Sequence, residues 1–417
     1  MTRTVFRNVT MLVGPQFEEQ TGDLVADGGR ITSLDAETEL HPDDEVHDLS
    51  GAVVVPGLMD AHCHLIYFEV ADPYDIELRK SLAEATMDAV HNAGTLLDLG
   101  FTTVRDVGSR GNIGVEARRA IDGGRIRGPK VHAAGQIISA PGGLGDFHPS
   151  HIFDHGAYHY SLAVQVVGPH EARAVVRRQL KDGVDWIKVG VSGTGFNPLC
   201  PAERNGLSDV EFEAVVDEAR QQGVPVAAHA ESAHAVHMAA AQGVATIEHG
   251  IYIDDQALDD MLANGVTMSP TLSMYRAFAQ RGSELGIPKE IVDEHKRTIE
   301  IHAESVRRAY QAGVPIVAGG DAGLTHFPQG QCVEELASYV NVLGMNPREA
   351  FATLTINIAR LLGVDDSLGT IEVGKQADLL VLRGNPLNDL DLLQRPESRI
   401  MVLQDGVVVA AQDATVS

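Results

Sequence analysis

The sequence predicts an α/β protein: a (β/α)8 TIM barrel with a small β-sandwich domain built from both ends of the chain. Three observations predict this architecture. Short apolar strand patterns alternate with amphipathic helical patterns over residues 57–362. Eight strand candidates occur in that stretch, and eight strands alternating with helices are typical of a parallel barrel. Residues 1–56 and 363–417 instead show only strand and turn patterns.

The two ends of the chain share one texture. Apolar and polar residues alternate around Gly and Asp turns, which is the pattern of half-exposed strands. The N-terminal segments are "TVFRNVTMLV", "DLVADGGRITSLD" and "DLSGAVVVPG", and the C-terminal ones are "GTIEVGKQADLLVLRGNP" and "RIMVLQDGVVVAA". We therefore expect one β-rich domain made of both ends.

The middle of the chain supplies the barrel. Its strand candidates are "GLMDAH", "TTVRDVG", "KVHAAG", "DWIKVG", "VPVAAH", "ATIEHG", "VTMSPT" and "PIVAGGD". Helical stretches such as "EARAVVRRQLKDG" and "DVEFEAVVDEARQQG" lie between them and end at Gly, a common helix stop. A long stretch over residues 135–184 is rich in Gly and His before its helix, and long loops of barrels often carry function.

Composition excludes several classes of function. The 417 residues include 32 basic and 58 acidic side chains, for a net charge of −26. This balance argues against nucleic acid and against anionic membranes as partners. The three cysteines are widely spaced, which fits neither a disulfide framework nor a thiolate zinc site. With no signal-peptide pattern and no apolar run near the roughly 20 residues of a membrane span, we expect a cytoplasmic protein.

The first strand candidate ends in a chemically distinctive triplet, His62-Cys63-His64. Alternate strand residues share a face, so His62 and His64 are expected to point together into the barrel mouth while Cys63 faces the core. Two neutral imidazoles at this spacing make half of a transition-metal site. Two incidental loop histidines would give the same triplet, so the pair alone does not decide.

Further polar residues stand at other strand ends. His229 ends "VPVAAH", His249 ends "ATIEH", and Asp321 follows "PIVAGG". Lys188 lies inside the apolar strand "DWIKVG", where a lysine either reaches solvent past its apolar stem or has a function. Each residue alone could be structural. Together they predict one site, because the carboxyl ends of barrel strands converge.

This constellation resembles the amidohydrolase superfamily, in the branch of Xaa-Pro dipeptidases and imidazolonepropionase-like enzymes. The matching motifs are "PGLMDAHCHL", "DWIKVG", "AAHAES", "IEHG" and "GGDAG". The C-terminal "ATLTINIARLLGVDDSLGTIEVGKQADLLVLRGNPL" is similar to that family's return to its small β-domain, so the resemblance covers nearly the whole chain.

The resemblance implies two divalent metal ions, with zinc the first choice and cobalt, manganese or iron as alternatives. It implies that His62, His64 and Asp321 hold one metal, and that His229 and His249 hold the second. Lys188 would react with CO2 and bridge both metals as a carbamate (N6-carboxylysine). Burial and nearby cations favour the neutral amine that this reaction needs. A metal-bridging hydroxide would attack the substrate, and Asp321 would act catalytically by moving its proton.

Substrate contacts depart from the family pattern. Prolidase-like relatives usually carry a His where this chain has Leu144 in "APGGLGDFH", and nearby histidines could replace it, His148 and His151 first among them. Solvated loop histidines are the alternative. Relatives also tend to have Tyr where this chain has Glu231, a carboxylate that would repel a substrate α-carboxylate, unless it lies on the barrel rim. Tyr275 completes the substrate-binding candidates.

The resemblance therefore implies hydrolysis of an amide-type C–N bond in an N-acyl amino acid, a dipeptide, or a carbamate, urea or aryl amide. Lactone or phosphotriester hydrolysis by the same metals stays open, as does a mononuclear deaminase. Deaminase relatives typically lack the strand-four lysine and carry Glu where this chain has Ser232. A non-catalytic scaffold is disfavoured because all six ligand positions are intact. The expected partner is a small molecule, and a homo-oligomer is compatible with the sequence.

Overall fold

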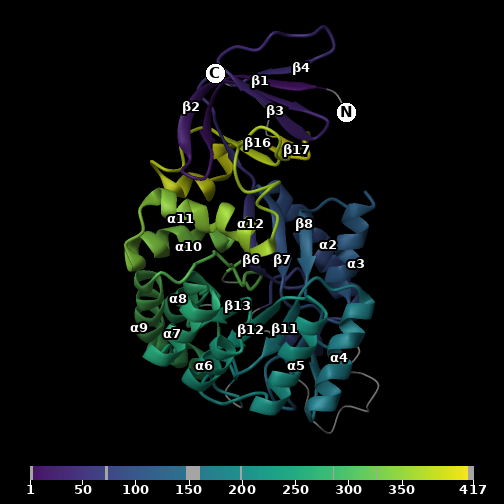
Figure 1. Cartoon of the computed structure of the whole chain (residues 1–417), viewed down its shortest axis with the longest axis vertical. Helices are drawn as coiled ribbons and strands as arrows, with labels where there is room; N and C mark the ends of the chain where they lie inside the picture. The colour runs from purple at the N-terminus through teal and green to yellow at the C-terminus, as the bar shows by residue number, and fades with distance from the viewer. Residues whose placement is uncertain are drawn as a thin grey trace.

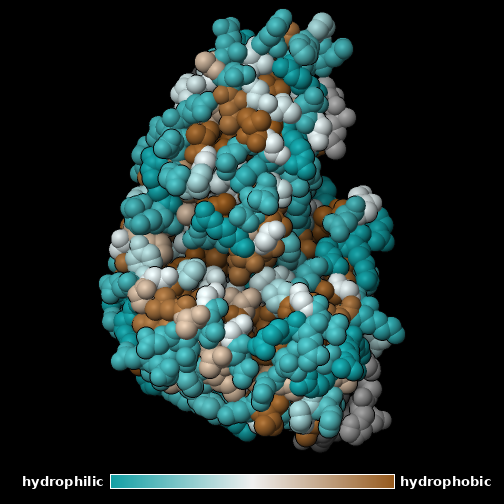
Figure 2. All heavy atoms as spheres, in the orientation of Figure 1, coloured by the Kyte–Doolittle hydropathy of each residue, from teal (hydrophilic) through white to brown (hydrophobic). Residues whose placement is uncertain are grey.

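The computed structural model describes residues 3–70, 74–146, 160–197, 200–284, 286–325 and 327–411. Figure 1 shows two parts, a β-rich part that contains both termini and a larger part of strands and helices. The face drawn in Figure 2 is mainly hydrophilic, in keeping with the acidic composition.

Both ends of the chain form one mixed sheet, as predicted. Its strands are β1 (Thr4–Val13), β2 (Glu18–Asp27), β3 (Arg30–Asp35), β4 (Glu45–Asp48), β5 (Val53–Pro56), β15 (Leu379–Leu382), β16 (Arg399–Gln404) and β17 (Val407–Ala411). Their order is β17-β16-β15-β5-β1-β2-β3, with β4 paired to β1. β5 and β15 join the two ends in antiparallel register, with Leu380 opposite Val55. All eight strands belong to one hydrogen-bonded sheet, so the two packed sheets of a sandwich stay a prediction.

The larger part contains two parallel sheets, which confirms the predicted α/β class. One has the order β6-β7-β8, and the other β10-β9-β11-β12-β13-β14. The strands are β6 (Leu58–Cys63), β7 (Phe101–Asp106), β8 (Lys130–Ala133), β9 (Ile137–Ser139), β10 (Ala163–Gln165), β11 (Ile187–Gly190), β12 (Val226–Ala230), β13 (Thr246–His249) and β14 (Thr267–Ser269).

Backbone hydrogen bonds connect these two sheets on both sides. On one side, the Asp185 amide donates to the Ala133 carbonyl at 2.8 Å. On the other, the segment predicted as the eighth strand lies between β14 and β6: Met268 donates to Pro315 at 2.8 Å, and Ala61 donates to Ala318 at 3.0 Å. This segment forms only an isolated bridge instead of a strand ladder. Its proline lacks an N–H, and its two following glycines disfavour regular strand geometry.

Helices follow most of these strands, and in Figure 1 they lie around them. They are α1 (Tyr74–Leu78), α2 (Leu82–Asp98), α3 (Ile113–Asp122), α4 (Pro169–Asp182), α5 (Asp209–Gln221), α6 (Ala233–Ala241), α7 (Asp255–Asn264), α8 (Leu272–Arg281), α9 (Lys289–Ala312), α10 (Glu334–Ser338), α11 (Pro347–Thr353) and α12 (Ile356–Leu362). Short helical turns are η2 (Gln331–Val333), η3 (Tyr339–Leu343), η4 (Leu390–Leu393) and η5 (Pro396–Ser398).

Local sequence explains the helix ends. Ser208 and Glu211 form a capping box at the start of α5, which satisfies amides that the first turn leaves free. α4 ends at Gly183, whose φ of 95° is left-handed. Within the described residues, no helix is long and apolar enough to cross a membrane.

Candidate metal centre

The six residues predicted to form one site at the barrel mouth lie around one cavity. They come from β6 and the turn after it, from β11, β12 and β13, and from the segment that follows Ala318. The residues are His62, His64, Lys188, His229, His249 and Asp321. Cys63, between the first two histidines, is buried as predicted, with its Sγ 3.9 Å from Gln329 Oε1. Parallel strand ends thus converge as the fold requires.

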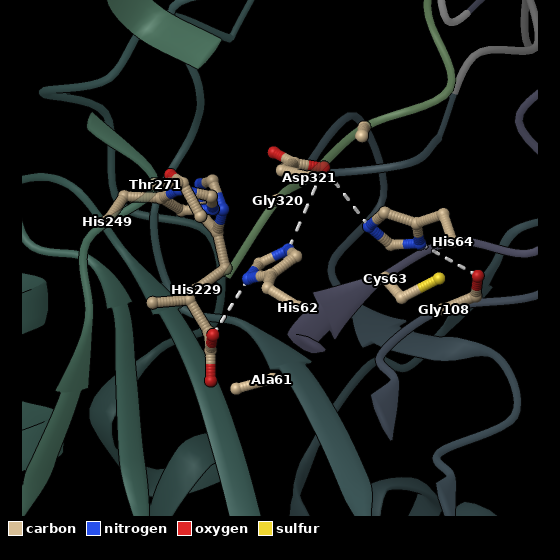
Figure 3. A network of polar contacts seen from close by, with 12 residues as sticks. Ala61, His62, Cys63, His64, Gly108, His229, His249, Thr271, Gly320 and Asp321 are labelled. Carbon is tan, nitrogen blue, oxygen red and sulfur yellow. Dashed lines mark hydrogen bonds and ion pairs between the residues drawn. The ribbon is translucent and has the colours of Figure 1, made fainter. Parts of the chain in front are cut away.

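Three of these side chains form a compact group. Asp321 Oδ1 is 3.4 Å from His64 Nε2 and 3.7 Å from His62 Nε2 (Figure 3). One ligand atom from each of the three lies within 4.8 Å of the others, a spacing that could hold a metal ion. The His229 and His249 rings lie opposite, with centroids 4.6 Å apart, and the His249 centroid is 5.0 Å from that of His62.

Hydrogen bonds fix which nitrogen of each β6 histidine is free. His62 Nδ1 is 2.7 Å from Glu248 Oε2. His64 Nδ1 is 2.8 Å from the Gly108 carbonyl (Figure 3). Carboxylate and carbonyl oxygens only accept hydrogen bonds, so each Nδ1 carries the proton. Each Nε2 then keeps its lone pair and faces Asp321, which is the state a metal ligand needs.

The second pair of histidines is held in the same way, by different partners. His229 Nε2 is 2.9 Å from the Gly193 carbonyl, so it carries the proton and Nδ1 keeps the lone pair. His249 Nδ1 is 2.7 Å from Thr271 Oγ1, which leaves Nε2 unengaged. In each of the four imidazoles, one ring nitrogen therefore contacts a neighbouring protein group and the other is available to bind a metal ion.

Burial keeps these imidazoles neutral. It lowers the pKa of His64 to about 4 and that of His229 to about 3. It also places the pKa values of His62 and His249 well below the usual range, aided by the charge of Lys188 beside His62. Because metals bind only the neutral ring, the site is set for cations at neutral pH.

Lys188 is the least satisfied group in the cavity wall. Its side chain is 1% exposed, and its Nζ has no hydrogen-bond partner among the described residues. Burial lowers the pKa of Lys188 to about 8, although Glu248 and Asp321 act in the opposite direction. The solvent-reaching alternative is therefore wrong, and a neutral amine is accessible near physiological pH.

The backbone is unusual at three site residues. The backbone angle φ is 71° at His249, 48° at Asp321 and 52° at Thr271. These are left-handed values that residues other than glycine rarely adopt. The Asp321 amide donates to the His62 carbonyl at 2.7 Å and so supports this conformation. Such strain persists where the surroundings impose it, and it gathers at functional sites.

Glu231 and Tyr275, predicted as substrate contacts, do not line the cavity. Glu231 is 0% exposed, so its alternative placement on the barrel rim is wrong. The Tyr275 hydroxyl donates to Glu231 Oε1 at 2.5 Å, and the Gly195 amide donates to Oε2 at 3.2 Å. Burial raises the pKa of Glu231 to about 8, although the hydrogen bonds from Tyr275 and Gly195 act to lower it. Its Oε1 lies 3.4 Å from His229 Nε2, so the pair supports the second histidine group from behind.

The rest of the cavity wall is mostly apolar. Besides the six residues it consists of Tyr67, Ile137, Leu144, Gly145, Leu162, Thr194, Phe196 and Leu324. Leu144 is one of these lining residues. It packs against β11 at Gly190, where an added Cβ would stand 2.8 Å from Leu144 Cβ. His148 and His151 lie outside the described residues, as do His155 and His159.

Two functional candidates were missed by the sequence reasoning. Glu248 contacts His62, and Arg105 contacts Glu248, its Nη2 donating to Oε1 at 2.8 Å. Both side chains are 0% exposed. The available signal was the same as for Lys188, a charged residue inside an otherwise apolar strand, here in "TTVRDVG" and "ATIEHG".

Comparison with known proteins places the site in a family. Residues 53–409 match the model of the amidohydrolase family, and the chain belongs to that family. The crystal structure of a prolidase complexed with N-methylphosphonate-L-proline is similar over 99% of this chain and 100% of that one, with a TM-score of 0.90 and 30% identity. A Xaa-Pro dipeptidase with bound methionine covers the same shares, with a TM-score of 0.87 and 30% identity.

The ochratoxinase of Aspergillus niger is similar in sequence, with 28% identity over 370 residues, 85% of this chain and 75% of that protein. Its crystal structure gives a TM-score of 0.84 at 25% identity and covers 98% of this chain and 96% of that one. The predicted family is therefore confirmed. The chain is an amidohydrolase, an enzyme that hydrolyses amide-type C–N bonds, and it contains residue groups suited to metal.

Proposed function

We propose that this enzyme uses two divalent metal ions, most simply zinc, with cobalt, manganese or iron as alternatives. His62 Nε2, His64 Nε2 and Asp321 hold the first ion, and His229 Nδ1 and His249 Nε2 hold the second. The single observation that carries the proposal is the arrangement of the four imidazoles, each of which has one ring nitrogen engaged by a neighbouring group and the other without a hydrogen bond to the described residues. Neutral nitrogen and carboxylate ligands suit all four metals.

Lys188 joins the two ion positions as a carbamate. Its neutral amine nitrogen would bond to the carbon of CO2 and release one proton to solvent. This would leave an anionic carboxylate on a side chain whose Nζ has no hydrogen-bond partner among the described residues. The buried position supports this assignment, because it favours the neutral amine before the reaction. The anion then balances cationic charge in a site with little access to solvent.

Catalysis combines the cations with one proton carrier. When bound, the two ions would activate a water molecule near neutral pH and polarise the scissile carbonyl. Asp321 accepts the proton of the attacking water at its carboxylate and passes it to the leaving nitrogen. Its side chain is 13% exposed and lines the cavity, so a substrate can reach it. The Nε2 atoms of His62 and His64 lie 3.7 and 3.4 Å from its Oδ1, so the proton carrier stands beside the first ion position.

The apolar cavity wall favours an uncharged substrate. Among the described lining residues, Lys188 is the only lysine or arginine, and as a carbamate it would no longer be a cation. A substrate α-carboxylate would therefore lack a cationic partner from these residues. We infer a small apolar aryl amide, N-acyl amino acid ester or amide, carbamate or urea. The similarity to ochratoxinase supports hydrolysis of an amide and does not bear on the charge of the substrate. Free dipeptides are the less suited class.

The same residues suggest the complete architecture. We infer that the two parallel sheets close into one (β/α)8 barrel over residues 57–362, with residues 1–56 and 363–417 as the two halves of the β-domain. The hydrogen bonds from Asp185 to Ala133 and from Ala61 to Ala318 support closure on both sides. The small-molecule site then lies at the carboxyl ends of the strands, where barrels hold their active sites.

A substrate panel with parallel metal analysis tests the proposal. The purified enzyme is assayed with zinc, cobalt or manganese and bicarbonate against aryl amides, N-acyl amino acids, dipeptides, carbamates, phenylureas, lactones and phosphotriesters. We expect about two metal ions per chain and the fastest turnover on an uncharged C–N substrate. One tight metal ion with ammonia released from an aminopurine would instead indicate a deaminase. Preferred turnover of lactones or phosphotriesters would overturn the substrate class.

A further inference from the structure

A buried ion pair lies directly behind the first metal-binding group. Glu248, on β13, receives hydrogen bonds from two sides: His62 Nδ1 is 2.7 Å from its Oε2, and Arg105 Nη2 donates to Oε1 at 2.8 Å. The Thr246 hydroxyl also donates to Oε1. The remaining donors of Arg105 reach the Ala61 carbonyl at 2.6 Å and Thr246 Oγ1 at 2.9 Å.

The arginine is itself fixed in place. Its guanidinium lies over the Trp186 ring, 4.6 Å from the ring centroid, and its side chain is 0% exposed. The stacking on Trp186 and the hydrogen bonds of the planar guanidinium together fix its orientation. A lysine ammonium could not make the same set of contacts. Hydrogen bonds thus connect side chains from three strands in sequence, namely Arg105 (β7), Glu248 (β13) and His62 (β6).

Of the four histidines, His62 is the one whose outer nitrogen is hydrogen-bonded to a carboxylate. The outer Nε2 of His229 also lies 3.4 Å from Glu231 Oε1, but its hydrogen bond goes to the Gly193 carbonyl. His64 and His229 donate to backbone carbonyls, and His249 contacts the Thr271 hydroxyl. A charged acceptor makes a stronger hydrogen bond than a neutral one and raises the basicity of the opposite ring nitrogen. His62 Nε2 should therefore be the most basic of the four imidazole nitrogens that face the metal positions, and so the strongest metal ligand among them.

We propose that Arg105 and Glu248 are positioning residues for the first metal position: they lock His62 with its proton on Nδ1 and direct Nε2 toward the ion. This inference rests on the proposed metal sites, and neither residue touches substrate. Among the six residues of the centre, the side-chain hydrogen bonds of the ion pair reach only His62. We therefore expect its effect to fall mainly on the group of His62, His64 and Asp321, although Glu248 is also the backbone neighbour of His249.

The geometry makes Glu248→Gln a decisive substitution, because the amide satisfies only one neighbour at a time. With its oxygen toward His62, its NH2 opposes the Arg105 donors. With its NH2 toward His62, it must donate to Nδ1, and the ring proton moves to Nε2. The second arrangement blocks the nitrogen that the metal requires. Glutamine has nearly the same shape as glutamate but changes which His62 nitrogen carries the proton. The substitution therefore distinguishes a role in positioning His62 from a role in packing alone.

The first measurement uses metal-free wild-type protein. Nitrogen-15 NMR of labelled histidines reports which nitrogen of His62 carries the proton, with the His62 signal assigned by a His62→Gln variant. We expect the Nδ1–H form in wild type and a shift toward the Nε2–H form in Glu248→Gln. A wild-type His62 with its proton on Nε2 overturns the inference, whether or not the variant folds.

The second measurement is zinc titration of the metal-free proteins by calorimetry. Loss of such a supporting contact typically weakens metal binding by about 10–100-fold. We expect one of the two binding steps to weaken by this factor in Glu248→Gln. The matched control is Asp378→Asn, which removes another buried carboxylate partner, 2.7 Å from Lys130 Nζ and outside the site. It should bind both ions as wild type does.

The outcomes separate the two proposals. Two ions bound by wild type and by Glu248→Gln with equal affinities overturn the positioning role alone. A wild-type chain that takes up no divalent metal overturns the proposed function and this inference together. A lower melting temperature in both variants with weaker zinc binding only in Glu248→Gln supports the inference, because general destabilisation would affect both alike.

Discussion

Replacing Lys188 by methionine should affect stability and activity in opposite directions. Methionine has a similar length and no charge, so it fills the same space in the cavity wall. In metal-free protein without CO2, the substitution removes a buried amine that is 1% exposed and has no described partner. In metal-loaded protein, it removes the proposed bridge between the two ions. We expect a more stable apoprotein and an inactive enzyme.

The size of the stabilisation follows from the pKa of Lys188. Burial lowers it from 10.5 to about 8. Each unit of pKa is worth about 1.4 kcal/mol, so the buried cation costs the folded state about 3 kcal/mol. The folded-state pKa is below the unfolded one, so this cost is fully present below pH 8. It declines as the pH rises from about 8 and is gone above about 10.5, where both states carry a neutral amine.

Thermal unfolding of the metal-free proteins measures the effect. With about 2.1 cal/mol/K of unfolding entropy per residue, the 417 residues give about 0.9 kcal/mol/K, so 3 kcal/mol raises Tm by about 3 °C. The experiment uses chelated, bicarbonate-free buffer at pH 7 and again at pH 9.5. We expect the gain at pH 7 to shrink at pH 9.5. Lys130→Met is the control, since it removes a lysine paired with Asp378 and should destabilise the protein.

Two results would refute this reasoning. A Lys188→Met apoprotein that melts below wild type at pH 7 would mean that the amine stabilises the fold. Full activity and metal content in the same variant would show that the lysine does not bridge the ions. Stability gained at the expense of activity is the expected behaviour of a residue kept for function.

Three further predictions concern the same centre. Lys188→Ala should abolish turnover and weaken metal binding, and acetate or propionate added to the assay should partly restore both; no rescue at any concentration, with metal content unchanged, would argue against a bridge. Asp321→Asn should lower kcat by about 10²–10⁴-fold if it moves the proton, and an unchanged kcat in steady-state assays would exclude that role. Chelation should remove hydrolysis and added zinc should restore it; activity that persists in metal-free protein contradicts the metal mechanism.

The position of the metal centre could be predicted because the ends of strands can be recognised from the sequence alone. Alternation places His62 and His64 on one face, and the carboxyl ends of parallel strands meet, so six positions scattered over 260 residues could be assigned to one cavity. The same rule of a charge in an apolar strand would have found Arg105 and Glu248.

Other features depend on contacts that no local pattern contains. The Tyr275 hydroxyl donates a hydrogen bond to Glu231 Oε1 although 44 positions separate the two residues, so two residues predicted to contact substrate contact each other. Three of the four partners that set the imidazole protons are a backbone carbonyl or a hydroxyl, groups that are present everywhere in a sequence. The eighth strand is a case where the pattern held but regular pairing did not, because Pro315 and two glycines interrupt the ladder.

The most direct test of the binuclear, lysine-bridged centre is a crystal structure of the enzyme grown with zinc and bicarbonate, with anomalous data at the zinc edge. We predict two zinc peaks, one beside His62, His64 and Asp321 and one beside His229 and His249, with continuous density for a carboxylated Lys188 between them. A single zinc ion with an unmodified lysine amine would contradict the account.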